Sequence, residues 1–192
     1  LIRMYTPGLL STLVFTYCWS RLFIFDNSII NNKLYSIIYV IAGAACLYLH
    51  YFALMTVGII GITGLFIIKR SKLWNYIFLN AVILVLFIPH FQIFLSQLSQ
   101  GGVGGQGGWL PKPDGDTFFI YFKSLFNDNI IYMLVLSIMV VSIFIFWKQI
   151  SFTKFHLLSV LFYVLPFLIA YVYSIERNPV LQMPGMLFAF PF

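Results

Sequence analysis

The stretch Leu34–Ile68 contains 35 residues and no charged side chain. As one α-helix it would be about 52 Å long at 1.5 Å per residue, whereas the hydrocarbon core of a bilayer is about 30 Å thick. The length therefore predicts two short helices joined by a turn. The midpoint, Leu49–His50–Tyr51, carries the best polar and interfacial residues for that turn. Each half is short for a full crossing, which favours a thinned bilayer or a hairpin tip below the headgroups.

The composition of the whole chain supports a membrane setting. Hydrophobic residues make up 61% of the sequence and charged residues 8%, with a mean hydropathy of +0.97. A soluble domain is nearer one-quarter charged, so these few charges cannot cover the apolar surface in water. The sequence predicts an all-α polytopic membrane protein. The net charge of +6 is spread between apolar runs, so we interpret it as a topology signal and expect no nucleic-acid partner.

About six transmembrane helices are expected. They cover residues 6–25, 34–49, 51–68, 73–95, 130–147 and 156–175, and a seventh span starts near Met186 if the closing apolar run continues. If the first span runs from outside to inside, seven basic residues fall inside (Arg21, Lys33, Lys69, Arg70, Lys72, Lys148, Lys154) and four outside (Arg3, Lys112, Lys123, Arg177). The positive-inside rule favours this orientation. The turn at His50 and the loop 96–129 then share the exterior face.

The exterior loop 96–129 is unusual in composition. It holds six glycines between residues 101 and 108, followed by "WLPKPDGD". The glycine run lacks the Lys-Ser/Thr of a phosphate-binding loop, which argues against nucleotide binding. A flexible linker and a loop that approaches a ligand closely both remain open. Downstream, "TFFIYFKSLF" has aromatic residues at helical spacing, which predicts a short amphipathic helix in the membrane interface.

Polar side chains at the exterior ends of the spans are the candidate site residues. His50 and Tyr51 can hydrogen-bond a phosphate or a sugar hydroxyl, or His50 can simply end a helix. Arg3, near Tyr5, can bind a phosphate through its planar fork or anchor to lipid headgroups. Lys112, in the exterior loop, can contact substrate or remain solvated.

Other polar residues have weaker signals. His90 and His156 occupy ordinary helix-end positions, and Cys18 and Cys46 are expected to pack in apolar surroundings. The four exterior acids could supply a general base, but no paired spacing singles one out (Asp114, Asp116, Asp128, Glu176). No HExxH, GxSxG or CxxC motif occurs, so no cofactor or metal is indicated.

The order of several short motifs resembles a known family. "RMY" opens the first span, "LHYFAL" marks the next exterior turn, "IPHFQIFLSQ" leads to "WLPKP", and "NPVLQ" precedes the final apolar run. This order is similar to the GT-C glycosyltransferases, in the bacterial branch related to protein O-mannosyltransferases and aminoarabinose transferases. The resemblance implies an enzyme of the bacterial inner (plasma) membrane. It would move a sugar from a polyprenyl-phosphate donor to a lipid, glycan or protein acceptor on the exterior, periplasmic face.

The resemblance also implies roles for individual residues. Arg3 and Tyr5 would border the active-site cavity, His50 and Tyr51 would line it, and the loop holding Trp109 and Lys112 would lie over the lipid-phosphate or acceptor groove. The catalytic carboxylate of such enzymes lies in an exterior loop before the "RMY" segment. It is therefore expected upstream of Leu1, and the chain is expected to be a fragment without transferase activity of its own.

Two departures and two alternatives accompany the resemblance. The glycine run is longer than the family pattern, and Met183–Pro184 stand where an Arg-Tyr pair is expected after "NPVLQ". A transporter or flippase of lipid-linked glycans would share the apolar composition, as would a structural membrane subunit. A transporter often carries internal repeats and charges near the bilayer midplane. Because neither feature is evident in the sequence, the transferase interpretation is favoured.

Overall fold

The structure is a computed structural model that describes residues 5–25, 32–99, 110–125, 129–149, 151, 153–182, 185, 188–189 and 192. The all-helical prediction is confirmed over these residues, which contain no strand. The helices are α1 (Tyr5–Trp19), continued by a π-helical turn η1 (Ser20–Ile24), α2 (Asn32–Leu49), α3 (Tyr51–Ile67), α4 (Arg70–Ser99), α5 (Thr117–Leu125), α6 (Ile130–Ile145), the 3-10 turn η3 (Trp147–Gln149) and α7 (Lys154–Glu176). Among the described residues, two helices are long and apolar enough to cross a membrane, α4 and the Phe155–Glu176 part of α7.

The helix boundaries lie close to the ranges expected from the sequence. The break within Leu34–Ile68 falls at His50, between α2 and α3. The largest difference is at α4, which continues to Ser99 although the expected span ended at residue 95. The polar residues Gln92, Ser96 and Gln97 end a hydrophobic run without ending a helix, because Gln and Ser are tolerated in helices. The run of glycines begins only at Gly101.

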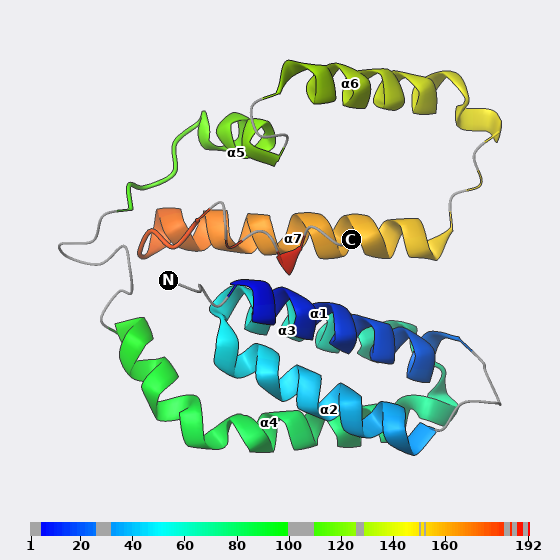
Figure 1. Ribbon diagram of the computed structural model, residues 1–192, viewed down its shortest axis with the longest axis vertical. Helices are drawn as coiled ribbons and strands as arrows, with labels where there is room; N and C mark the ends of the chain where they lie inside the picture. The colour runs from blue at the N-terminus through cyan, green and yellow to red at the C-terminus, as the bar shows by residue number, and fades with distance from the viewer. Residues whose placement is uncertain are drawn as a thin grey trace.

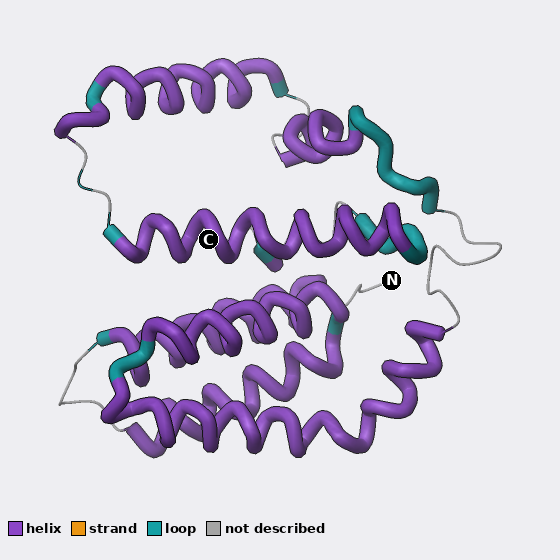
Figure 2. Tube along the Cα trace, turned by 180° about the vertical axis from the view of Figure 1, so that it is seen from behind, coloured by secondary structure: helices purple, strands orange, loops and turns teal. Residues whose placement is uncertain are grey.

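Helices α1 to α4 form a bundle, and α7 lies along it. Helix α1 packs on α2 and α3, α2 packs on α4, and α3 contacts α7 (Figures 1 and 2). Close packing depends on small residues, as it does between membrane helices. A Cβ atom on Gly43 of α2 would lie 2.6 Å from the Ile83 Cδ1 of α4. A Cβ on Gly64 of α3 would overlap the Tyr76 side chain of α4.

A hydrogen-bonded chain of polar residues crosses the core of this bundle. The Tyr39 hydroxyl donates to Asn80 Oδ1 at 3.1 Å, and Asn80 Nδ2 donates to the Tyr76 carbonyl at 2.8 Å. The Tyr76 hydroxyl lies 2.7 Å from the Gly61 carbonyl and 3.1 Å from the Ile60 carbonyl. Because these buried groups find partners in each other and in the backbone, they tie α2, α3 and α4 together and fix their register.

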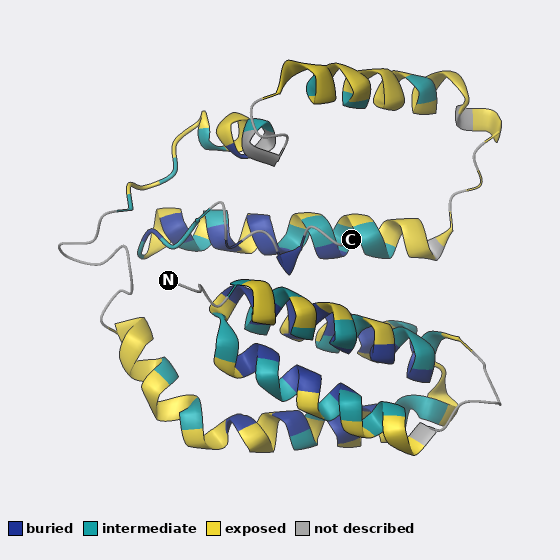
Figure 3. Cartoon of the chain, in the orientation of Figure 1, coloured by how far each residue is buried: buried dark blue, intermediate teal, exposed yellow. Residues whose placement is uncertain are grey.

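Helices α5 and α6 lie on the far side of α7 from the bundle (Figure 1). The stacked rings of Tyr121 and Phe167, 4.5 Å apart, join α5 to α7. Helix α6 has no buried residue (Figure 3), and apart from Ser137 and Ser142 its side chains are aliphatic or aromatic. A helix that is apolar all round is normally buried in a protein core or a membrane.

The bundle has two chemically different ends. The start of α1, His50, Ser99 and the end of α7 lie at one end, which we call the cavity end (Figure 1). The opposite, basic end holds η1, the start of α2, the α3–α4 turn and η3. It carries the seven basic residues assigned to the inner side (Arg21, Lys33, Lys69, Arg70, Lys72, Lys148, Lys154). Of the described residues between 96 and 129, Ser99 lies at the cavity end, whereas α5 packs through Tyr121 on Phe167 near the middle of α7.

Candidate functional site

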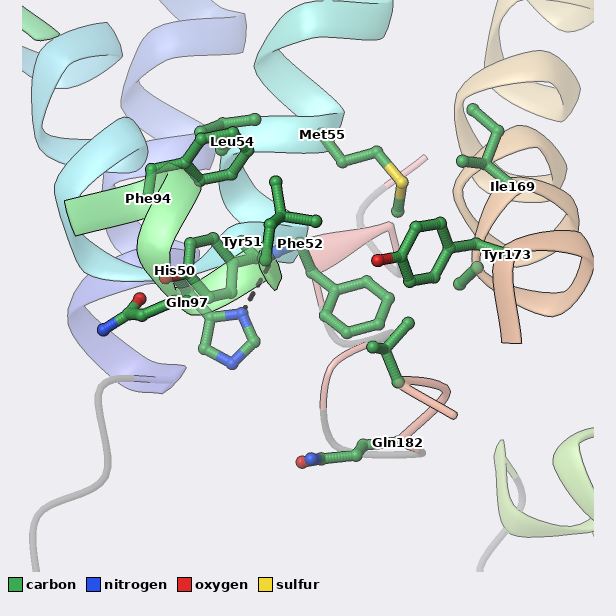
Figure 4. Close-up of a pocket in the computed structure, with 13 residues that line it drawn as sticks. His50, Tyr51, Phe52, Leu54, Met55, Phe94, Gln97, Ile169, Tyr173 and Gln182 are labelled. Carbon is green, nitrogen blue, oxygen red and sulfur yellow. Dashed lines mark hydrogen bonds between the residues drawn. The ribbon is translucent and has the colours of Figure 1, made fainter. Parts of the chain in front are cut away.

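A cavity of about 310 Å³ lies at the cavity end, between α3, α4, α7 and the segment that follows α7 (Figure 4). Its walls are mainly apolar (Phe52, Leu54, Met55, Phe94, Leu98, Ile169). Its polar groups come from His50, Tyr51, Gln97, Tyr173 and Gln182. Apolar walls with a few convergent polar groups are the usual form of a binding site for a small or amphipathic molecule.

His50 caps the start of helix α3 and also lines the cavity. It is the N-cap of α3 in an extended conformation, and its Nδ1 accepts a hydrogen bond from the Phe52 backbone N–H at 3.2 Å. An imidazole nitrogen that accepts from an N–H carries no proton, so the proton of the neutral ring is on Nε2. Burial lowers the pKa of His50 and favours this neutral form.

Tyr5 lies against His50 and reaches the segment after α7. The two rings are 5.1 Å apart, and the Tyr5 hydroxyl donates to Gln182 Oε1 at 3.3 Å. The structure therefore brings Tyr5, His50 and the adjacent Tyr51 together at one end of the bundle. The Tyr51 ring packs against Phe94 of α4 at 5.6 Å and forms part of the cavity wall.

The "NPVLQ" segment is held in place by one buried hydroxyl. Ser174, in the last turn of α7, accepts hydrogen bonds from the backbone N–H groups of Val180 at 3.0 Å and Leu181 at 3.1 Å. Its side chain is fully buried. The chain thereby turns back at the end of α7, and Gln182 reaches Tyr5. Gln182 went unidentified from the sequence, although its position after a helix that ends on the exterior side was a usable signal.

Gln97 and Tyr173 are further cavity residues that were not identified from the sequence. Gln97 belongs to the part of α4 beyond Pro89, where the helix bends toward α7 (Figure 1). A proline inside a helix removes one backbone hydrogen bond and commonly produces such a bend. Near it, the Tyr48 hydroxyl of α2 donates to the Leu86 carbonyl at 2.7 Å. The bend gives α4 a wall of the cavity that a straight helix drawn from hydropathy would not supply.

Lys112 lies at the same end of the fold but does not line the cavity. Its Nζ donates to the Ile175 carbonyl at 3.3 Å, in the last turn of α7. Such terminal carbonyls lack a partner within their own helix, and a cation there also interacts favourably with the helix dipole. Nearby, the Tyr171 hydroxyl donates to the Asp114 carbonyl at 3.3 Å. Lys112 therefore fastens the loop to α7.

The described acids of this loop are engaged in local structure. Asp114 Oδ1 accepts from the Thr117 hydroxyl at 2.9 Å and from the Asp116 N–H at 3.1 Å, just before α5. The Thr117 hydroxyl, with these backbone donors, lowers the pKa of Asp114. A carboxylate with a lowered pKa is a weaker base, so Asp114 serves as a turn acceptor. Arg3, Trp109, Asp128 and Met186 lie outside the described residues.

The remaining candidate side chains are engaged in helix capping or packing. His156 caps the start of α7 with Thr153, and His90 packs against Tyr48 with ring centres 5.0 Å apart. Cys18 and Cys46 are buried and free. Within the described part of the chain, no group of three or more His, Cys, Asp or Glu residues could hold a metal ion.

Comparisons with known proteins identify no similar protein. No protein-family model matches the chain, and neither the curated proteins nor the solved structures contain a match.

Proposed function

We propose that this chain is a polytopic membrane domain in which α1 with η1, α2, α3, α4, α6 and α7 are the six spans. The apolar composition, the lengths of α4 and α7, and the largely exposed apolar surface of α6 support this proposal. The ends of the bundle differ in charge as the positive-inside rule requires, with the cavity end outside. The surrounding bilayer covers the apolar side chains of α6.

The cavity binds the sugar donor in this proposal, and the donor is a sugar linked to polyprenyl phosphate. The observation that carries the proposal is that the cavity has apolar walls and a polar end at His50 and Gln182, both of which are contacted by Tyr5. An isoprenoid chain fits the apolar walls, and the phosphate–sugar junction fits the hydrogen-bonding groups. The described residues that line the cavity include no carboxylate. The cavity is therefore proposed as the donor-binding part of a GT-C-like glycosyltransferase, with no base assigned.

The test is sugar transfer by the full-length protein in proteoliposomes. We expect a labelled sugar to pass from a polyprenyl-phosphate donor to an acceptor, and His50→Ala to lower the rate about 10-fold or more, since a hydrogen bond to a charged group is worth about 1.5–3 kcal/mol. His90→Ala is the matched control, because His90 lies at the same end but not in the cavity wall. Transbilayer movement of the donor without transfer would instead favour a flippase. An unchanged rate in His50→Ala would contradict the proposed site.

A further inference from the structure

The free polar groups at the polar end of the cavity are hydrogen-bond donors. We infer that His50 Nε2 and the Gln182 side-chain amide form a pair of neutral donors for a phosphodiester oxygen, and that Tyr5 positions both groups. This inference rests on the proposed function for the lipid chain and sugar around that phosphate. His50 and Gln182 would recognise the phosphate itself, and the sequence motifs did not identify these two residues as a pair.

The donor character of His50 follows from its role as a helix cap. Its Nδ1 is occupied by the Phe52 N–H at 3.2 Å. A neutral imidazole has one donor and one acceptor, so only the Nε2–H is left for a ligand. The extended backbone at His50 and the ring contacts with Tyr5 and Phe188, at 5.1 and 4.8 Å, hold the ring in this orientation. Toward a ligand, His50 can therefore only donate a hydrogen bond, because its acceptor nitrogen is already used by Phe52.

The donor character of Gln182 follows from its contact with Tyr5. The Tyr5 hydroxyl donates to Gln182 Oε1, which directs the NH₂ group of the same amide away from Tyr5. No other hydrogen bond to this amide forms among the described residues. The Ser174 hydroxyl holds the preceding backbone through Val180 and Leu181. In Figure 4 the Gln182 side chain extends toward the side of the cavity where His50 lies.

Among the described residues, the uncharged lining of the cavity favours a phosphodiester over a phosphate monoester as the ligand. No lysine or arginine is among the described residues that line the cavity, and the walls near the polar groups are apolar. A doubly charged phosphate monoester finds no countercharge among these described residues, and its desolvation beside them would be strongly unfavourable. A phosphodiester carries a single charge and only accepts hydrogen bonds, so it suits two neutral donors.

The experiment measures binding to the purified full-length protein in nanodiscs. The probes are the methyl diester of a polyprenyl phosphate, which has the phosphodiester but no sugar, and the matching polyprenol. We expect the native protein to bind the diester at least about 10-fold more tightly than the polyprenol. Gln182→Glu replaces the NH₂ donors with a carboxylate oxygen and should abolish this preference. Tyr5→Phe keeps the ring, frees the amide to rotate, and should reduce the preference several-fold.

The control variant is Gln92→Glu, which places the same charge on α4 at an exposed position outside the cavity wall. It should retain most of the preference, and polyprenol binding should remain unchanged in all variants. If Gln182→Glu also loses polyprenol binding, Tyr5→Phe decides the outcome. A native protein without preference for the diester overturns the proposed function together with the donor pair. A native preference that survives Gln182→Glu and Tyr5→Phe, or that Gln92→Glu abolishes equally, overturns the donor pair alone.

Discussion

The hydroxyl of Tyr5 and the side-chain oxygen of Gln182 are hydrogen-bonded at 3.3 Å although 177 positions separate the two residues. The bond connects the first turn of α1 to the chain just after α7. Gln182 lines the cavity together with Phe94 and Gln97 of α4. The polar end of the cavity is therefore assembled from helix ends, while the helix interiors supply its apolar walls.

The pH dependence of stability should report the cap at His50. Burial lowers the pKa of His50, so the unfolded chain binds more protons than the folded protein between that lowered value and the ordinary value of about 6.5. The free energy of unfolding should therefore fall as the pH drops below about 6.5 and should be insensitive to this group above it. His50→Asn keeps a capping side chain without a titrating ring. Thermal unfolding in detergent should show a smaller acid loss for that variant, and an identical loss would contradict the assignment.

Removal of the Ser174 hydroxyl should destabilise the protein. Ser174→Ala leaves the partly buried N–H groups of Val180 and Leu181 without their acceptor, and an unsatisfied buried group costs about 1–3 kcal/mol. Ser137→Ala is the control, because Ser137 is exposed on α6 and donates only to its own helix, at the Met133 carbonyl. It should change the free energy of unfolding by less than about 0.5 kcal/mol. Equal effects of the two variants in denaturant titrations would disprove the proposed anchoring role.

Two glycines of α3 should respond oppositely to the same change. A Cβ at Gly64 overlaps the Tyr76 side chain, so Gly64→Ala should displace the hydroxyl that bonds to the Ile60 and Gly61 carbonyls. The expected loss is about 1–3 kcal/mol. A Cβ at Gly58 meets nothing within 4 Å, so Gly58→Ala should stabilise α3 by about 0.5–1 kcal/mol. The midpoints of thermal unfolding should move in opposite directions, and a shift of both in one direction would refute the packing described.

The proposed topology should be visible by cysteine labelling of intact cells. On a background without Cys18 and Cys46, Gly115→Cys should react with an impermeant reagent from outside, because Gly115 lies before α5 in open space. Ser71→Cys, exposed at the basic end, should react only after the membrane is permeabilised. Labelling of both sites from outside would rule out the proposed orientation, in which the cavity end is exterior.

The sequence predicted the helices better than the cavity, for a physical reason. Helix length and the break at His50 follow from local properties, namely the absence of charge and the length of an apolar run. The placement of Tyr5 and His50 at the same end of the fold also followed, because the ends of successive antiparallel spans lie on one side. Gln182 and Gln97 were missed because their places depend on a buried Ser174 hydroxyl and a bend at Pro89. Those are tertiary features that hydropathy does not encode.

The ring of Phe188 occupies the space that a side chain at Gly8 would fill. A Cβ on Gly8 would lie 2.7 Å from Phe188 Cε1, and Phe188 is fully buried beside His50. In evolution, these two positions should therefore behave as one unit. A homologue with a larger residue at position 8 is expected to carry a smaller one at position 188, so that their summed volume stays nearly constant. A substitution at only one of them would push the ring toward His50 and reshape the polar end of the cavity.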